Sequence, residues 1–203
     1  YQGEIITPSR CGRMDQACAY GKTPVFITFD GDRIEVQELR PKHDYYMVVA
    51  DLMAGKNTQK ILADLNSAFP GTKGKVAEDV RYYLGPINKE IVDKAKKIME
   101  NDHPEKLGLL MTEAQNLFDQ FVIAACPEEL TSPQLHKILK QTDIKSLIYG
   151  GKGVGSQGDG CVQFLAKGMK EQKQLLERLK SQGLDPYPLT IPREDRTKDG
   201  NTA

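Results

Sequence analysis

Residues 145–165 read KSLIYGGKGVGSQGDGCVQFL, and this stretch decides how the C-terminal part of the chain is built. Two runs typical of short strands, 145–149 and 161–165, flank a segment from Gly150 to Gly160, called here the glycine segment. Six of its eleven residues are glycine. Residues 168–182 then predict a charged amphipathic helix, and a last short strand follows. This order of elements predicts an α+β arrangement.

The glycine segment favours close contact between the backbone and a ligand. Without Cβ atoms, N–H groups can approach phosphate oxygens, and successive exposed amides form an anion-binding nest. Lys152 would add a positive charge to this cradle. A tight hairpin between two buried strands would need the same glycines, so the glycine count alone leaves both interpretations open. The segment is not a Walker loop, because neither Ser nor Thr follows Gly151-Lys152 and no long helix opens behind it.

The first part of the chain is rich in expected strands, and the middle part is rich in expected helices. The β-branched and aromatic runs 24–29 and 33–39 flank Asp30-Gly31-Asp32, which is typical of a hairpin. The continuous apolar run 45–52 predicts a strand buried on both faces. Apolar residues at three- and four-residue spacing predict amphipathic helices over 57–69, 75–84, 88–99, 106–125 and 133–140. Ser132-Pro133 is expected to cap the last helix and form its first turn.

Composition limits the classes of partner. No apolar run reaches the roughly eighteen residues that a membrane-spanning helix needs, and 28 basic residues balance 28 acidic ones. We therefore expect neither membrane nor nucleic-acid binding, and any phosphate chemistry must be local. The cysteines and histidines are Cys11, Cys18, Cys126, Cys161, His43, His103 and His136. They lack metal-ligand spacing, so we expect reduced thiols, surface histidines, no metal site and a cytoplasmic location.

A second candidate site lies near the start of the chain. Asp15 stands two residues from Arg13 and five from Arg10. A carboxylate held near cations stays ionised at neutral pH, so it can accept a proton or orient a hydroxyl group. A structural ion pair near a helix start is the alternative interpretation of the same residues.

The two candidate sites together resemble one family. Residues 12–16, GRMDQ, followed by Tyr20-Gly21, are similar to the GxMDQ segment of galactokinase-type sugar kinases. These belong to the galactokinase, homoserine kinase, mevalonate kinase and phosphomevalonate kinase (GHMP) superfamily. The glycine segment resembles the third motif of that superfamily. Residues 107–115, LGLLMTEAQ, are similar to its LGxLM helix, and 55–58, GKNT, resemble its basic-x-Thr turn near the substrate.

The resemblance implies an α+β fold in which the end of an S5-like first domain, 1–55, precedes a helical and ferredoxin-like C-terminal domain, 56–191. The remaining stretch, 192–203, carries no large apolar residue and is expected to be a disordered tail. The first two superfamily motifs, which hold the ATP phosphates and part of the substrate, are missing from the sequence. We therefore expect the chain to be the C-terminal portion of a kinase whose N-terminal segment completes the site, and to be inactive alone.

The resemblance also implies a function, namely ATP-dependent phosphorylation of a small-molecule hydroxyl, with a sugar as the expected substrate and Mg²⁺ as cofactor. Asp15 would be the catalytic carboxylate, and Arg13 would set its ionisation. The expected phosphate-loop residues are Lys152, Gly153, Gly155, Ser156, Gly158 and Gly160, and the expected substrate-binding residues are Gln16, Tyr20 and Thr58.

Two residues of the glycine segment depart from the family pattern. Gln157 and Asp159 stand where relatives have glycine or another small residue. A carboxylate beside a triphosphate is repulsive unless Mg²⁺ or a basic group offsets it, so Asp159 either has such a partner or braces the loop. The same departures motivate the alternative of a noncatalytic metabolite-binding or regulatory domain derived from a GHMP kinase.

Overall fold

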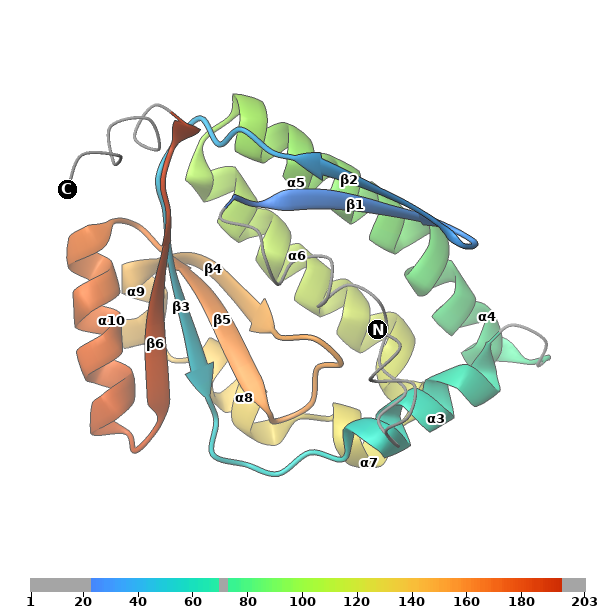
Figure 1. The fold of residues 1–203 in the computed structure, drawn as a ribbon. Coiled ribbons are helices and arrows are strands. Elements are labelled where there is room, and N and C mark those ends of the chain that lie inside the picture. The colour runs from blue at the N-terminus through green and yellow to red at the C-terminus, as the bar shows by residue number, and fades with distance from the viewer. Residues whose placement is uncertain (1–22, 70–72, 195–203) are drawn as a thin grey trace.

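The computed structural model describes residues 23–69 and 73–194, whose elements are shown in Figure 1. The strands are β1 (Val25–Asp30), β2 (Arg33–Glu38), β3 (Tyr45–Asp51), β4 (Ile148–Gly153), β5 (Cys161–Ala166) and β6 (Asp185–Ile191). The helices are α3 (Thr58–Ala68), α4 (Lys75–Tyr82), η1 (Tyr83–Ile87), α5 (Asn88–Asn101), α6 (Pro104–Val122), η2 (Ile123–Ala125), α7 (Pro127–Leu130), α8 (Pro133–Leu139), α9 (Thr142–Leu147) and α10 (Met169–Ser181).

The continuous apolar run at 45–52 forms β3, a central strand of an antiparallel sheet. The strand order is β4-β5-β3-β6, so β3 lies between two strands from the far end of the chain (Figure 1). Val48, for example, lies opposite Phe164 on one side and Pro188 on the other. Both faces of the sheet are covered, which explains why β3 lacks an alternating polar pattern.

Successive residues of β3 face two different cores. Val48 and Ala50 pack with α8, α9 and α10, in a cluster that includes the fully buried Phe164 and Leu175. Tyr45, Met47 and their neighbours pack instead against α6. A further core lies among the helices and contains Ile61, Tyr83, Phe118, Val122, Cys126 and Leu130.

Helix α6 approaches β4 backbone to backbone. Gly108 of α6 faces Gly150 of β4, and a Cβ atom on Gly150 would lie 1.8 Å from the Gly108 carbonyl oxygen. A Cβ atom on Gly108 would lie 2.3 Å from Tyr149 Cβ. Two of the glycines in this region are therefore required by packing, and they fix the height of α6 above the sheet.

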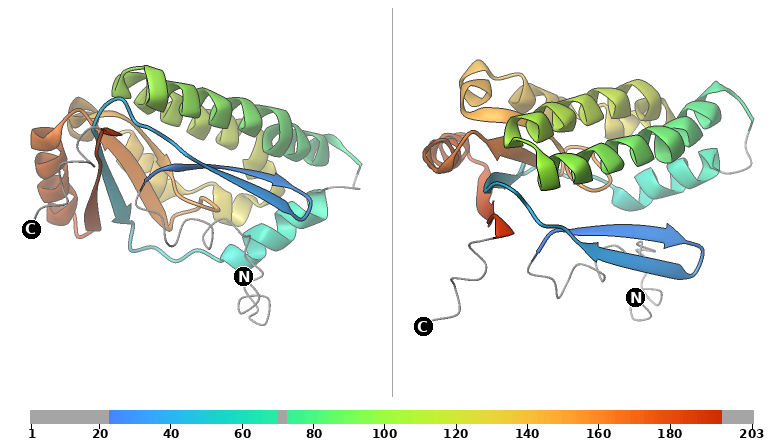
Figure 2. Two further views of the ribbon diagram at one scale, coloured as in Figure 1. Left: turned by 45° about the horizontal axis from the view of Figure 1, so that its top comes forward. Right: turned by 90° about the horizontal axis from the view of Figure 1, so that it is seen from above.

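The β1–β2 hairpin forms a separate two-stranded sheet that lies alongside α5 (Figure 2). Lys96 of α5 connects the two, because its Nζ donates to Gln37 Oε1 at 2.6 Å and lies 4.7 Å from the ring centroid of Phe26. The hairpin and its turn at Asp30-Gly31-Asp32 confirm the sequence prediction.

One expectation needs correction. Residues 145–147 belong to α9, and the strand begins at Ile148 and runs through Gly153, so four residues of the glycine segment are in β4. Runs of glycine are typical of loops, but here they pair with β5, and Gly150 makes room for α6. The domain division expected after residue 55 stays a prediction. β3, which precedes that position, pairs with β5 and β6 from the C-terminal part of the chain.

Candidate functional site

The free part of the glycine segment runs from the end of β4 to the start of β5. Gly155 and Gly158 have φ angles of +59° and +76°, and Gln157 has +66°, so the chain makes two tight turns here. Among the described residues, nothing accepts a hydrogen bond from the backbone N–H of Gly155, Ser156 or Gly158. A Cβ atom on Gly155 would meet nothing within 4 Å. These N–H groups can therefore serve as donors to phosphate oxygens.

Lys56 brings a cation to the same segment from the turn after β3. Its Nζ donates to the Gln157 carbonyl oxygen at 3.0 Å, and its side chain lies over Gly158 and Gly160. A Cβ atom on Gly160 would lie 2.8 Å from Lys56 Cδ, so the glycine makes room for this side chain. The resemblance placed Lys56 in the basic-x-Thr turn near the substrate, but its contact with the glycine segment, about 100 positions away, has no local signal in the sequence.

Asp159 braces the segment against α8. Its carboxylate accepts hydrogen bonds from the backbone N–H groups of Gln134 at 3.2 Å and Leu135 at 2.9 Å. These are unpaired donors of the first helical turn, which favour a negative charge. Ser132 was expected to cap this helix, but its hydroxyl donates to the Leu130 carbonyl oxygen instead. The negative charge of Asp159, which would repel a phosphate, is thus compensated by two backbone N–H groups of α8.

A buried polar network supports the end of β4. The Gly153 N–H donates to Gln115 Oε1 at 2.7 Å, and Gln115 Nε2 donates to Asp119 Oδ1 at 2.8 Å. His136 Nε2 lies 3.6 Å from Asp119 Oδ2. Burial raises the pKa of Asp119, while Gln115 and His136 act in the opposite direction. His136 is therefore a half-buried partner of a carboxylate, which corrects the expectation of a surface histidine.

Gln115→Met is expected to lower the free energy of unfolding by about 2 kcal/mol, because methionine has similar length but leaves the buried Gly153 N–H without an acceptor. Denaturant unfolding measures the loss, and hydrogen exchange at the Gly153 amide should become faster. Gln174→Met, on the exposed side of α10, is the matched control and should change little. Unchanged exchange at Gly153 would show that Gln115 does not hold this backbone.

Lys152, the cation that the sequence placed in the phosphate cradle, points elsewhere. It lies on the same face of β4 as Gly150, toward α6, and its Nζ donates to the Gly153 carbonyl oxygen at 2.7 Å. Burial lowers the pKa of Lys152 from its ordinary value of 10.5. Lys56 lies over Gly158 and Gly160, whereas Lys152 approaches the segment from the α6 side of β4.

The lowered pKa of Lys152 gives a stability prediction. Between the folded-state pKa and 10.5 the unfolded chain binds more protons at this position, so its contribution to stability should rise with pH in that window. Lys152→Met should remove that contribution and raise stability at neutral pH. Urea unfolding at several pH values tests this, with Lys145→Met, at an exposed position of α9, as control. A variant that keeps the full pH dependence would contradict the assignment.

The other predicted site residues divide into two groups. Asp15, Arg13, Gln16 and Tyr20 lie outside the described residues, so their roles stay predictions. Thr58 is the first residue of α3 and is exposed, and Asn57 caps that helix by accepting from Lys60 N–H. The turn at 55–58 contacts the glycine segment through the hydrogen bond from Lys56 to Gln157, although the two segments are far apart in the sequence.

The described residues fit a nucleotide phosphate better than a metal cage. Free amides and Lys56 provide donors and positive charge, whereas no group of three or more His, Cys, Asp or Glu side chains within the described ranges could hold a metal ion. Mg²⁺ often enters such sites on substrate phosphates with one or two carboxylates. In this same part of the chain, no helix is long and apolar enough to cross a membrane.

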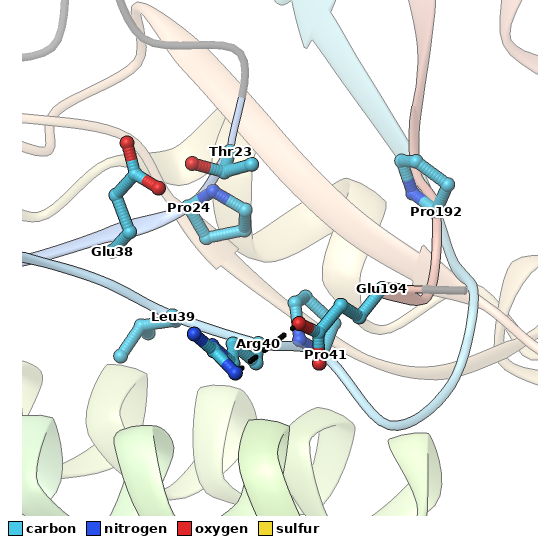
Figure 3. A pocket seen from close by; sticks show the side chains of 8 residues that line it. All are labelled: Thr23, Pro24, Glu38, Leu39, Arg40, Pro41, Pro192 and Glu194. Atoms are coloured by element: carbon cyan, nitrogen blue, oxygen red, sulfur yellow. Dashed lines mark ion pairs between the residues drawn. The ribbon is translucent and has the colours of Figure 1, made fainter. Parts of the chain in front are cut away.

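A pocket of 240 Å³ lies at the end of β3 that is remote from the glycine segment (Figure 3). The link between the hairpin and β3 meets the end of β6 there, and Arg40 forms an ion pair with Glu194 at 3.4 Å. Because Ile191 pairs with Tyr45 while Cys161 pairs with Asp51, this pocket is separated from the glycine segment by the length of the strand. It is not part of the candidate site.

Comparisons by sequence find nothing: no protein-family model and no curated protein matches the chain. Solved structures do match. L. major mevalonate kinase in complex with R-mevalonate is 18% identical, with a TM-score of 0.64 over 92% of this chain and 53% of that chain. L. lactis galactokinase complexed with galactose is 14% identical, with a TM-score of 0.55 over 91% and 55%. S. pneumoniae phosphomevalonate kinase is 15% identical, with a TM-score of 0.57 over 79% and 45%.

The class of fold follows from these matches: the chain has an α+β fold of the GHMP kinases. This confirms the fold class and the resemblance that the sequence motifs indicated. The chain spans about half the length of the solved kinases it matches.

Proposed function

We propose that the complete protein is an ATP-dependent kinase that transfers a phosphoryl group to a hydroxyl of a small molecule, with a sugar as the expected acceptor. The observation that carries the proposal is the glycine segment: it has backbone N–H groups from which no described residue accepts, and it lies beside Lys56 within a GHMP kinase fold. Phosphoryl transfer depends mainly on alignment and on neutralising the charge of the transferred group, and this arrangement can supply both.

The roles of the residues follow from that chemistry. The N–H groups of Gly155, Ser156 and Gly158 would donate to phosphate oxygens, and Lys56 would add positive charge. Asp15 would accept the proton of the acceptor hydroxyl, with Arg13 keeping it ionised. Bound ATP supplies the phosphoryl group, and Mg²⁺ offsets the charge of its phosphates.

We assign binding of the acceptor to Gln16, Tyr20 and Thr58. The sequence Met14-Asp15-Gln16 supports a sugar over other acceptors, because mevalonate-type relatives have a different residue pattern around the same Asp. The solved structures with this fold include kinases named for mevalonate, phosphomevalonate and galactose, so they do not favour a sugar. Since the chain spans about half of those kinases, we place the remaining ATP contacts in a preceding segment of the same protein.

The test is ADP release by the complete protein with Mg-ATP and a panel of acceptors: free hexoses and pentoses, mevalonate, and homoserine. ADP that depends on a sugar, with a phosphorylated sugar seen by mass spectrometry, is the expected result. ADP that depends only on mevalonate or homoserine would retain the kinase and overturn the sugar. Binding of a sugar without ADP, by protein shown to be folded, would support the noncatalytic metabolite-binding alternative.

A further inference from the structure

A cavity of 350 Å³ lies beside the glycine segment, between α5 and α6. Most of its wall is apolar and is formed by side chains of η1, α5 and α6, among them Ile91 and Leu107. Lys152, Gly155 and Gln157 of the glycine segment close one side. Lys152 is the one charged side chain among the residues that line this cavity.

The ammonium group of Lys152 is poorly matched by its surroundings. Its three hydrogens have one acceptor among the described residues, the Gly153 carbonyl oxygen, and no carboxylate in those ranges forms an ion pair with it. A lysine in an apolar wall is normally paired, because removal of an unpaired charge from water is costly. Burial accordingly lowers the pKa of this lysine.

Gln157 lies beside Lys152, because both side chains donate to the Gly153 carbonyl oxygen, at 3.3 and 2.7 Å. Gln157 is only 4% exposed, and its Oε1 makes no hydrogen bond to any described residue. Buried polar atoms are rarely left in this state in folded proteins. The Gln157 Oε1 atom lies toward Gly153, since a Cβ atom on Gly153 would be 2.1 Å from it, and as an acceptor it does not attract an anion. The anion-binding group of this mostly apolar cavity is therefore Lys152.

We propose that this cavity binds a small anion with an apolar chain, whose acidic group contacts Lys152 while the chain lies between α5 and α6. The volume is at the small end of the range for ligand pockets, which suits a chain of about six carbons. A neutral sugar offers neither a charge nor an apolar chain, so this ligand goes beyond the proposed acceptor. An occupant would touch Gly155 and Gln157, and through them it would affect the phosphate-binding turns.

Calorimetric titration of the complete protein without nucleotide tests the proposal with three six-carbon probes: hexanoate, hexanol and hexylamine. Hexanoate should bind more tightly than hexanol, and hexylamine should not bind. Lys152→Met should weaken hexanoate binding about tenfold or more, because the charge pair is lost. Lys145→Met, at an exposed position of α9, should bind as the unmodified protein does.

Two further variants locate the site. Lys152→Arg keeps the charge and should retain binding of hexanoate, whereas Ala95→Phe fills the cavity from α5 and should abolish it. Affinity for hexanoate should also fall as rising pH discharges the lysine. Equal binding of hexanoate by Lys152→Met and the unmodified protein, or absence of hexanoate binding, would overturn the proposal.

The anion has two sources, a separate effector or an acidic acceptor of the kinase, and kinetics distinguish them. If hexanoate raises the KM for the acceptor identified by ADP release and leaves kcat unchanged, the cavity belongs to the acceptor site. If it changes kcat without competing, the anion is an effector. Because the titration needs no ATP, it tests the cavity separately from the proposed function. Hexanoate binding can be absent while kinase activity is present, and it can be present while kinase activity is absent.

Discussion

Gly150→Ala is expected to lower the free energy of unfolding by about 3 kcal/mol, at the upper end of the usual cost of an overpacked core. The new methyl group would lie 1.8 Å from the Gly108 carbonyl oxygen and 2.8 Å from Thr112 Oγ1. Relief requires α6 to move away from β4, because the nearest obstacle is backbone and not a flexible side chain. That movement would also loosen the Leu165 and Met111 contact beneath the helix.

Chemical denaturation of Gly150→Ala beside Gly55→Ala measures this effect. Gly55 is exposed, has nothing within 4 Å of a Cβ position and has no positive φ angle, so its substitution should change stability by no more than about 0.5 kcal/mol. Equal losses in the two variants would show that α6 does not approach the sheet as closely as described.

Asp15→Asn is expected to reduce kcat of the complete kinase about a hundredfold, the usual size of the loss when a general base is removed. Asparagine keeps the shape of the side chain but cannot accept the hydroxyl proton. If Asp15 acts on the acceptor alone, the KM for ATP should change little. Steady-state ADP release with the acceptor found in the panel measures both constants.

Asp30→Asn provides a matched control for that experiment. Asp30 ends β1 at the exposed tip of the hairpin, so its loss of charge should leave turnover unchanged. Turnover of Asp15→Asn within a few-fold of the unmodified enzyme would remove Asp15 from the catalytic role. The ADP assay itself would still stand in that case, so the kinase and its base are tested separately.

Periodicity in the sequence predicted most elements correctly, because strands and helices with one or two buried faces carry a direct pattern. Three- and four-residue spacing located α3, α5 and α6 within a few residues of their observed ends. The hairpin followed from Asp30-Gly31-Asp32, and the run 45–52 predicted a strand covered on both faces.

The sequence did not predict features that depend on contacts between distant segments. Gly150 to Gly153 form a strand because they pair with β5, and α6 passes close to Gly150; local propensity cannot show either contact. Asp159 caps a helix 24 residues earlier in the chain, and Gln115 supports a strand 38 residues later. A polar residue such as Gln115 among the apolar positions of α6 was the one local signal of this network.

The position of β3 constrains how the protein acquires its structure during synthesis. β3 is complete at Asp51, but its partners begin at Cys161 and Asp185. A ribosome adding about 5 to 20 residues per second needs several seconds or more to make the residues between them. Throughout this interval an apolar strand has two unpaired edges, which is a condition that invites aggregation and chaperone binding. Residues 161–191 therefore complete the sheet, and nascent chains released before Cys161 should not fold.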